Sequence, residues 1–304
     1  MKTSKWERYV VRKPVYEAVP GVKNRQSHAM TFMSNRQVPE ANHYIELGWV
    51  YNIPVPNPHI HEHIHDFDEV ILYWGGNPYT PQVLGGEIEF YIGGQPITFN
   101  TTTSMFIPRE TPHGPVTWKK FQFPHIEMIL ALGNGNPLES LEKSGINKPK
   151  KALPPKTINF DYEQYVIRSP MREAALGFRG LQSPSMTYMS SVQINAANLY
   201  IDWAWVYDIV KPRIGEHVHH NNEEIVLHIG GDPDNPEDLG ADMEYGLGGD
   251  LLQYNTSYAI FIPKGLRHGP LNWKKVRKPH VEMAIVFGIG TFKERSEGSS
   301  FIRS

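Results

Sequence analysis

Short apolar runs separated by turn sequences form the dominant pattern of this 304-residue chain. In the first half the runs have the length of β-strands, and turn sequences rich in Gly and Asn stand between them. The predicted strands lie at residues 44–51, 70–74, 87–92, 104–107 and 126–132. Many short strands at this spacing predict an all-β barrel or jelly roll.

The whole pattern occurs twice. Residues 9–14 are matched by residues 165–170, and residues 118–120 by residues 273–275, with an offset that stays between 154 and 156 throughout. This period is far too long for a solenoid repeat, so it indicates a duplicated domain. Residues 143–156 are rich in Lys and Pro, which is linker composition. We therefore expect one domain at residues 1–148 and a second at residues 149–304.

A histidine-rich stretch in the first copy has the residue types of a metal site. His63 and His65 stand two positions apart, so on a strand both side chains point to one face, and Glu69 has the same parity. His113 lies in a later Pro-rich turn and is the candidate for a fourth ligand. Imidazole nitrogen and carboxylate oxygen suit Mn, Fe, Co, Ni, Cu or Zn.

The second copy repeats both halves of this arrangement in the same order. Its candidate ligands are His217, His219, Glu224 and His268. Glu223 is an alternative carboxylate, but the apolar run that follows Glu224 aligns with the run that follows Glu69, so we choose Glu224. Two copies with both halves in place make a chance match a poor explanation.

The order of these residues resembles the paired motifs of the cupin superfamily. The shared elements are His-x-His, a Glu, a Gly, and later a Pro ahead of a His. In the first copy they are His63, His65, Glu69, Gly76, Pro108 and His113, and in the second they are His217, His219, Glu224, Gly231, Pro263 and His268. Glu110 and Thr117 depart from the second motif in the first copy, at positions that are not ligands.

The resemblance implies two tandem cupin barrels (double-stranded β-helix, or jelly-roll), each with a three-His, one-Glu metal site. The implied cofactor is a divalent transition metal, with manganese or iron as first choice and zinc, nickel, cobalt or copper as further options. The implied function is a metal-dependent enzyme that acts on a small carbonyl or phenolic substrate. Cleavage of a C–C bond by a dioxygenase, a decarboxylase or a ring-opening hydrolase is our first hypothesis.

Two other functions fit the same resemblance. One is a cupin isomerase or epimerase that works through a metal-bound enediolate. The other is a metal-containing cupin that binds a small molecule without turnover. The sequence does not decide which barrel is active.

Other candidate catalytic residues lie on predicted strands inside the barrels. Tyr73 and its counterpart His228 share the face of the ligand carboxylates, as a substrate-orienting phenol and a site imidazole, or as core residues. His125 and His280 each share a strand face with a Glu two residues later, which fits a proton shuttle or a structural hydrogen-bonded pair. Arg36 has no basic counterpart in the second copy and is either an anion-binding residue or a surface residue.

Composition narrows the choice of partners and location. The net charge of −2 does not favour nucleic acid, and no apolar run is long enough to span a membrane. There are 0 cysteines, which excludes disulfides and thiolate ligands. The first residues lack the apolar core of a signal peptide. We therefore expect a cytoplasmic protein that takes a small-molecule substrate, with no nucleic-acid or membrane partner and with a possible homodimer through sheet edges.

Overall fold

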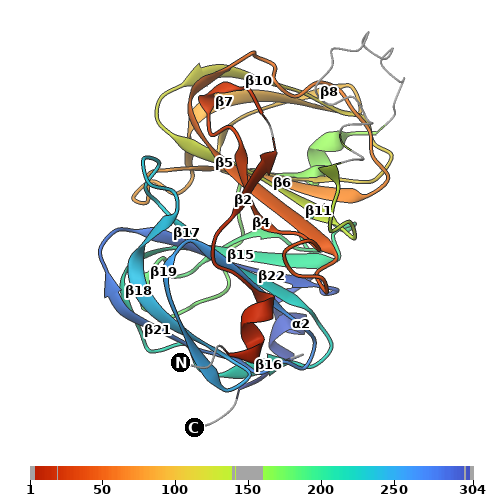
Figure 1. The fold of residues 1–304 in the computed structure, drawn as a ribbon. Helices are drawn as coiled ribbons and strands as arrows, with labels where there is room; N and C mark the ends of the chain where they lie inside the picture. The colour runs from red at the N-terminus through yellow and green to blue at the C-terminus, as the bar shows by residue number, and fades with distance from the viewer. Residues whose placement is uncertain (1–3, 19, 139–140, 142–159, 298, 302–304) are drawn as a thin grey trace. The chain divides into compact units, whose positions relative to one another are not determined.

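A computed structural model describes residues 4–18, 20–138, 141, 160–297 and 299–301 (Figure 1). The chain forms two compact units. One unit is Pro14–Arg168, and the other joins the residues up to Lys13 to those from Ser169 onwards. These bounds differ from the expected domains 1–148 and 149–304, because each barrel takes in the short segment that precedes the other copy. The predicted linker, residues 143–156, lies outside the described residues.

The N-terminal unit contains two antiparallel sheets. Its larger sheet has β12 at one edge and β2 at the other, and β3 pairs with β5 beside that path. In order the strands are β12 (Val166–Ile167), β9 (Thr103–Ile107), β6 (Asp68–Gly75), β11 (His125–Leu132), β5 (His43–Val55), β4 (Ala29–Met33) and β2 (Val15–Ala18), with β3 (Lys23–Arg25). The smaller sheet is β10 (His113–Phe121), β7 (Val83–Ile92) and β8 (Gln95–Thr101).

The C-terminal unit repeats this plan. Its first sheet is β1 (Val10–Val11), β20 (Tyr258–Ile262), β17 (Glu224–Gly230), β22 (His280–Phe287), β15 (Leu199–Lys211) and β13 (Arg179–Leu181), with β14 (Met186–Met189) on β15. Its second sheet is β19 (Asp250–Thr256), β18 (Asp238–Leu247), β21 (His268–Val276), β16 (His217–His219) and β23 (Ser299–Phe301). A short helix, α2 (Phe292–Glu297), follows β22.

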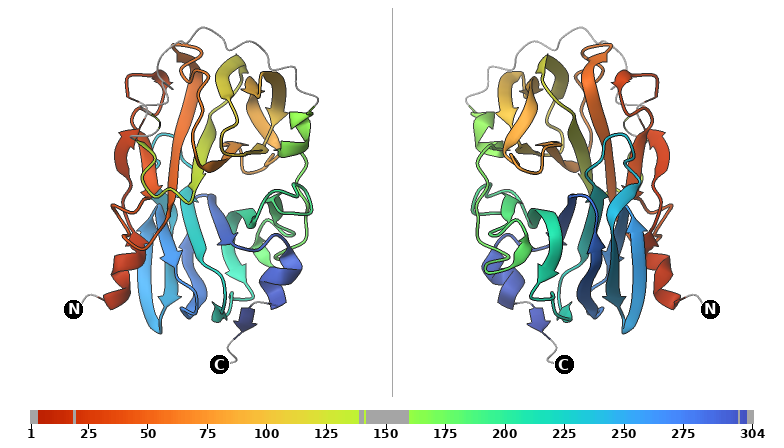
Figure 2. Two further views of the ribbon diagram at one scale, coloured as in Figure 1. Left: turned by 90° about the vertical axis from the view of Figure 1, so that its right-hand side faces the viewer. Right: turned by 90° about the vertical axis from the view of Figure 1, so that its left-hand side faces the viewer.

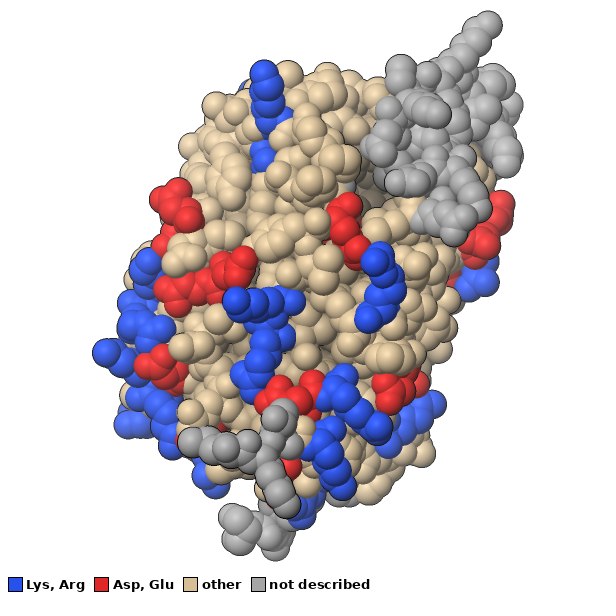
Figure 3. Space-filling model, viewed as in Figure 1, with Lys and Arg blue, Asp and Glu red and all other residues tan. Residues whose placement is uncertain are grey.

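The expected fold class is confirmed. All five strands predicted for the first copy lie within observed strands, and the five adjacent strands β12-β9-β6-β11-β5 of the larger sheet have the same order as β1-β20-β17-β22-β15 of the second copy. Strands of each copy bury one set of side chains between the two sheets, and Trp118 and Phe90 belong to this interior in the N-terminal barrel. No helix among the described residues has the length and apolar character to cross a membrane. On the face drawn in Figure 3, acidic and basic side chains are interspersed.

Each barrel is completed by a short arm from elsewhere in the chain. The 3₁₀ helix η1 (Lys5–Tyr9) leads into β1, which pairs with β20 of the C-terminal barrel. The 3₁₀ helix η2 (Tyr162–Tyr165) leads into β12, which pairs with β9 of the N-terminal barrel. In Figure 2 the red segment accordingly lies beside blue strands and the green segment beside orange ones. These arms explain why the compact units differ from the two halves of the sequence.

A glycine in a tight turn lets each arm approach its barrel. Gly248 has a φ of +59°, and a side chain there would collide with the indole of Trp6. Gly93 stands in the same relation to Tyr162 of the other arm. Glycine at these turns therefore provides both the left-handed backbone and the space for an aromatic ring.

We predict that Gly248→Ala destabilises the protein more than Gly265→Ala does. Both glycines have positive φ, +59° and +75°, but only Gly248 faces a neighbour within 4 Å. The two substitutions therefore have a similar cost in backbone conformational energy. At Gly248, overpacking against Trp6 should lower the free energy of unfolding by about a further 1–3 kcal/mol. Denaturant unfolding of the two variants measures the difference. Equal losses would show that the arm does not depend on this contact.

Candidate metal centres and substrate cavity

The three candidate histidines of the N-terminal barrel converge on one point, and the candidate carboxylate lies beside two of them. His63, His65 and His113 offer nitrogens that lie within 4.8 Å of one another, and all three side chains are buried. Glu69 lies next to two of these histidines, with its Oε2 3.6 Å from His65 Nε2 and 3.3 Å from His113 Nε2. The structure thus brings together the residues that the motif predicted.

Backbone carbonyls fix the orientation of these imidazoles. The Nδ1 atoms lie 2.9, 2.8 and 2.8 Å from the carbonyl oxygens of residues 61, 67 and 111, respectively. A carbonyl oxygen can only accept, so each Nδ1 must carry the proton and donate it. The Nε2 atom of each ring is then directed toward the centre, which is the arrangement that outer hydrogen bonds give to metal-binding histidines.

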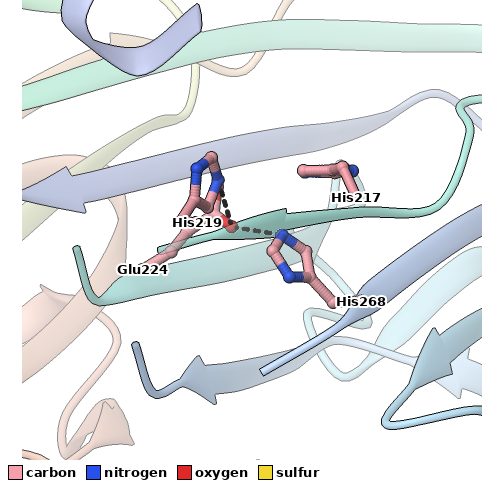
Figure 4. A group of neighbouring side chains, drawn as sticks. All are labelled: His217, His219, Glu224 and His268. Carbon is pink, nitrogen blue, oxygen red and sulfur yellow. Dashed lines mark ion pairs between the residues drawn. The ribbon is translucent and has the colours of Figure 1, made fainter. Parts of the chain in front are cut away.

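The C-terminal barrel has a second centre of the same kind, drawn in Figure 4. The ligand atoms of His217, His219, Glu224 and His268 lie within 4.8 Å of one another. Glu224 Oε2 is 3.4 Å from His219 Nε2 and 3.0 Å from His268 Nε2. Carbonyl oxygens again hold imidazole nitrogens, 3.2 Å from His217 Nδ1 and 2.9 Å from His268 Nδ1. Glu224, and not Glu223, is the carboxylate that the structure brings to the histidines.

The residues fit a divalent cation. His65 Nε2, His113 Nε2, His268 Nε2 and Glu224 Oε2 are buried and have no hydrogen-bond partner among the described residues. Buried polar atoms are normally satisfied, so such a cluster requires an explanation. Burial and the neighbouring His113 lower the pKa of His63 to about 3, which keeps this ring neutral. A cation between imidazole lone pairs and a carboxylate satisfies all of these atoms together.

His63, His65 and Glu69 do not lie on one continuous strand, contrary to the expectation from their spacing. His63 forms only an isolated bridge with His113, and a bend at residues 66–67 separates His65 from β6, which carries Glu69. The parity of a single continuous strand therefore does not place Glu69. In the second copy His217 and His219 do lie on one strand, β16. Convergence comes from the packing of separate elements, which spacing alone does not encode.

A cavity of about 380 Å³ opens onto the C-terminal centre. Strands β15, β17, β18 and β22, the segment around Ala174–Phe178 and helix α2 supply its walls. Most lining residues are apolar, among them Trp203, Tyr245, Phe178 and Leu271. The polar ones besides the ligands include Asp202, Glu282 and Arg295. This volume lies within the range of small-molecule pockets, and a few polar groups in an apolar wall are typical of them.

A salt-bridge network fills the corresponding interior of the N-terminal barrel. Arg25 and Glu127 pair at 2.7 Å, and each side chain is 1% exposed. The hydroxyl of Tyr73 donates to Glu127 at 2.7 Å. Burial alone would raise the pKa of Glu127, but Arg25 and the other partners hold it below its usual value. Gly48 provides room, since a side-chain carbon there would lie 3.3 Å from the guanidinium.

The second barrel keeps the carboxylate of this network and loses its partners. Leu181 pairs with Val206 in the register in which Arg25 pairs with Val50. His228 likewise stands opposite Glu282 where Tyr73 stands opposite Glu127.

Glu282 consequently has no ion pair or hydrogen bond among the described residues. Burial and the charge of Asp202 raise the pKa of Glu282 to about 8. The carboxyl group therefore carries a proton at neutral pH and faces the cavity.

The other proposed catalytic residues lie outside the cavity wall. His125 and His280 are fully buried and accept hydrogen bonds from Trp118 and Trp273 at 2.9 and 3.0 Å. Their hydrogen bonds within the described residues therefore go to tryptophans and backbone and not to the Glu two residues later, and burial lowers the pKa of both histidines to about 4. Neither lines the cavity of the C-terminal barrel.

His228 and Tyr73 also have core positions. His228 is fully buried, stacks on Tyr258 with ring centroids 5.0 Å apart, and has no hydrogen-bond partner among the described residues at either ring nitrogen. Burial lowers the pKa of His228, so the ring is neutral. Its role in catalysis stays a prediction. Tyr73 belongs to the N-terminal network described above.

Sequence reasoning missed two polar residues of the cavity. Arg295 and Asp202 were not selected, because α2 was not predicted and an Asp within a strand gives no motif. Arg36, the anion-binding candidate, is a surface residue that pairs with Glu17 at 3.0 Å and is 62% exposed. The replacement of Arg25 in the first copy by Leu181 in the second is the sequence difference that indicates an unfilled interior in the C-terminal barrel.

Comparisons with known proteins support the fold. No family model and no curated protein matches the sequence. Among solved structures, a single-residue mutant of the Bacillus subtilis oxalate decarboxylase OxdC aligns with a TM-score of 0.57 and 12% identity, over 95% of this chain and 77% of that one. AerE from Microcystis aeruginosa aligns with a TM-score of 0.50 and 11% identity, over 90% of this chain and 96% of that one.

We predict that the two centres bind metal independently. The purified protein should hold one ion per centre, and His63→Ala and His217→Ala should each lose one equivalent while keeping the other. His220→Ala, which removes a histidine outside both groups, is the matched control and should keep both. Elemental analysis after gel filtration measures the content. Full metal content in both ligand variants would refute the assignment.

A second prediction concerns the pH dependence of stability. Because its pKa rises from 4.5 unfolded to about 8 folded, Glu282 favours folding most below pH 4.5 and loses this contribution as the pH rises toward 8. In metal-free protein, Glu282→Gln should therefore gain stability relative to the wild type over this interval, by at most about 1.4 kcal/mol per pH unit. Urea unfolding from about pH 5 to about pH 8.5 brackets the interval in which the carboxyl group titrates. Parallel stability curves would show that Glu282 is not perturbed.

Proposed function

We propose, from the bicupin fold of this chain, that it is a metal-dependent enzyme whose C-terminal barrel cleaves a C–C bond in a small carbonyl or phenolic compound. The cavity is the main support for this proposal, because His217, His219 and Glu224 line it together with the protonated carboxyl group of Glu282. His217, His219, Glu224 and His268 would hold a divalent ion, which would supply Lewis acidity toward a substrate carbonyl. The first expectation for the ion remains manganese or iron.

The chain's own groups favour non-oxidative cleavage. Breaking a bond next to a carbonyl leaves an electron pair on one carbon, and Glu282 holds a proton that can be transferred to that carbon. The other fragment leaves as carbon dioxide in a decarboxylation, or takes up hydroxide from water and leaves as a carboxylic acid in a hydrolysis. The carboxylate of Glu282 then takes a proton back from water, so no oxidant is consumed. The apolar walls, including Trp203 and Leu271, limit water around the reacting carbon. One protein of similar fold is named an oxalate decarboxylase, which is a reason to assay decarboxylation first.

The N-terminal barrel serves stability in this proposal. Arg25, Glu127 and Tyr73 occupy the interior that corresponds to the cavity. Removing one partner of a buried ion pair destabilises a protein by about 3–5 kcal/mol. We therefore expect loss of Arg25 or Glu127 to lower the stability of this barrel strongly. Substrate then has access to one of the two centres.

The test is a screen of 3-oxo acids, diketones and hydroxybenzoates with metal-loaded protein, in air and under strict anaerobiosis. We predict product formation that does not depend on oxygen. Glu282→Gln should lower kcat by about 10²-fold or more, which is the usual contribution of a general acid. Glu244→Gln removes a surface carboxylate that pairs with Lys274 and should leave kcat unchanged. Stoichiometric oxygen consumption would overturn the non-oxidative reaction.

The same carboxyl group also fits an isomerase, the second candidate. Glu282 could remove a proton from one carbon and return it to the next, because a carboxyl with a pKa of about 8 is tuned for both directions near neutral pH. Solvent deuterium in a product that otherwise keeps the substrate's mass would favour this reaction over bond cleavage.

A further inference from the structure

A single arginine faces the C-terminal cavity. Arg295 lies on helix α2, and of the described residues that line the cavity it is the only Lys or Arg. Its guanidinium is directed toward the metal ligands, since Nη2 lies 3.8 Å from Glu224 Oε1. A positive group is thus held beside the centre, on the wall of the cavity.

The contacts of Arg295 with the cavity carboxylates are loose. Nη1 lies 3.5 Å from Asp202 Oδ2, and the Glu224 contact is longer still. Charge-assisted hydrogen bonds are normally about 2.7–2.9 Å long. The network of the other barrel reaches that length, with Arg25 and Glu127 at 2.7 Å. Asp202 and Glu224 thus meet the guanidinium at longer distances than that, and its central carbon lies 5.8 Å from the ring centroid of Tyr200.

The remaining walls are suited to an apolar body. Trp203, Phe178 and Phe292 place aromatic rings around the cavity, and Leu181 and Leu271 add aliphatic surface. A ligand with a charged end at Arg295 would lay its apolar part against these residues. Guanidinium binds carboxylate in a planar, two-point arrangement that an ammonium group cannot reproduce.

We propose that Arg295 binds the carboxylate of the substrate, and that the substrate is a small monocarboxylate with an apolar or aromatic body. This deepens the proposed function, since it rests on the C-terminal cavity as the substrate site. Asp202 is the exchangeable partner that holds the guanidinium until the carboxylate arrives. Arg295 is a substrate-binding residue in this account, and Asp202 is a positioning residue.

The test is binding of benzoate and of its neutral isostere benzamide to the full-length protein as isolated, by calorimetry. Wild type should bind benzoate at least about 10-fold more tightly than benzamide, the size expected for hydrogen bonds to a charged group. Arg295→Gln should lower the affinity for benzoate by about 10- to 100-fold and change the affinity for benzamide by no more than about threefold. The affinity of Arg295→Lys for benzoate should lie between those of wild type and Arg295→Gln. Arg277→Gln, at a surface ion pair of the same unit, should behave as wild type.

A second variant tests the role of Asp202 with the opposite sign. Asp202→Asn removes the competing carboxylate, so benzoate should bind more tightly than in wild type, and Arg295→Gln in that background should abolish the gain. This keeps the proposal testable if Arg295→Gln alone does not fold.

Three results would overturn the proposal. The first is that the wild type fails to bind benzoate, the second is that it binds benzoate and benzamide with equal affinity, and the third is that the preference for benzoate survives Arg295→Gln. The last result would place the anion on the metal centre instead of on Arg295. Because the readout is binding, a protein that passes this test but turns over no compound in the screen refutes the proposed reaction and not the carboxylate site.

Discussion

Two clusters of largely buried imidazoles, each beside a carboxylate, are the constraint on which the rest of the structure depends. Carbonyl oxygens hold the Nδ1 atoms of His63, His65 and His113, which leaves their Nε2 atoms for the barrel interior, where Glu69 lies beside His65 and His113. Without a cation these groups would be costly to bury, because their polar atoms have too few partners among the described residues. The fold is arranged so that separate strands and turns meet at that point.

Duplication makes the two barrels a comparison within one chain. Both keep the ligand set and the Trp-to-His hydrogen bond, yet the interior around Glu127 and Glu282 differs. Arg25 fills one barrel and neutralises its carboxylate, while Leu181 leaves the other carboxylate unpaired beside a cavity. A few sequence differences thus distinguish the packed interior of the N-terminal barrel from the cavity of the C-terminal barrel. In the latter they leave a carboxyl group, Glu282, with a raised pKa. Perturbed groups of this kind cluster at functional sites.

The sequence predicted much of the fold and little of the cavity. Strand positions followed from apolar runs, and the metal ligands followed from a repeated motif with fixed spacing. Glu282 was predicted to share a strand face with His280, but its lack of an ion-pair partner among the described residues depends on Leu181, which is distant in sequence. Arg295 reaches the site from a short helix that carries no ligand motif. Residues brought together by tertiary packing are therefore the ones that spacing could not assign, and the arms that complete each barrel were missed for the same reason.

The most direct test of the central claim is anomalous X-ray diffraction from crystals grown with manganese. The account predicts one anomalous peak among the Nε2 atoms of His63, His65 and His113, and a second among those of His217, His219 and His268. Carboxylate density from Glu69 and Glu224 should adjoin the respective peaks. Crystals that contain manganese elsewhere, with neither cluster marked by a peak, would contradict the account.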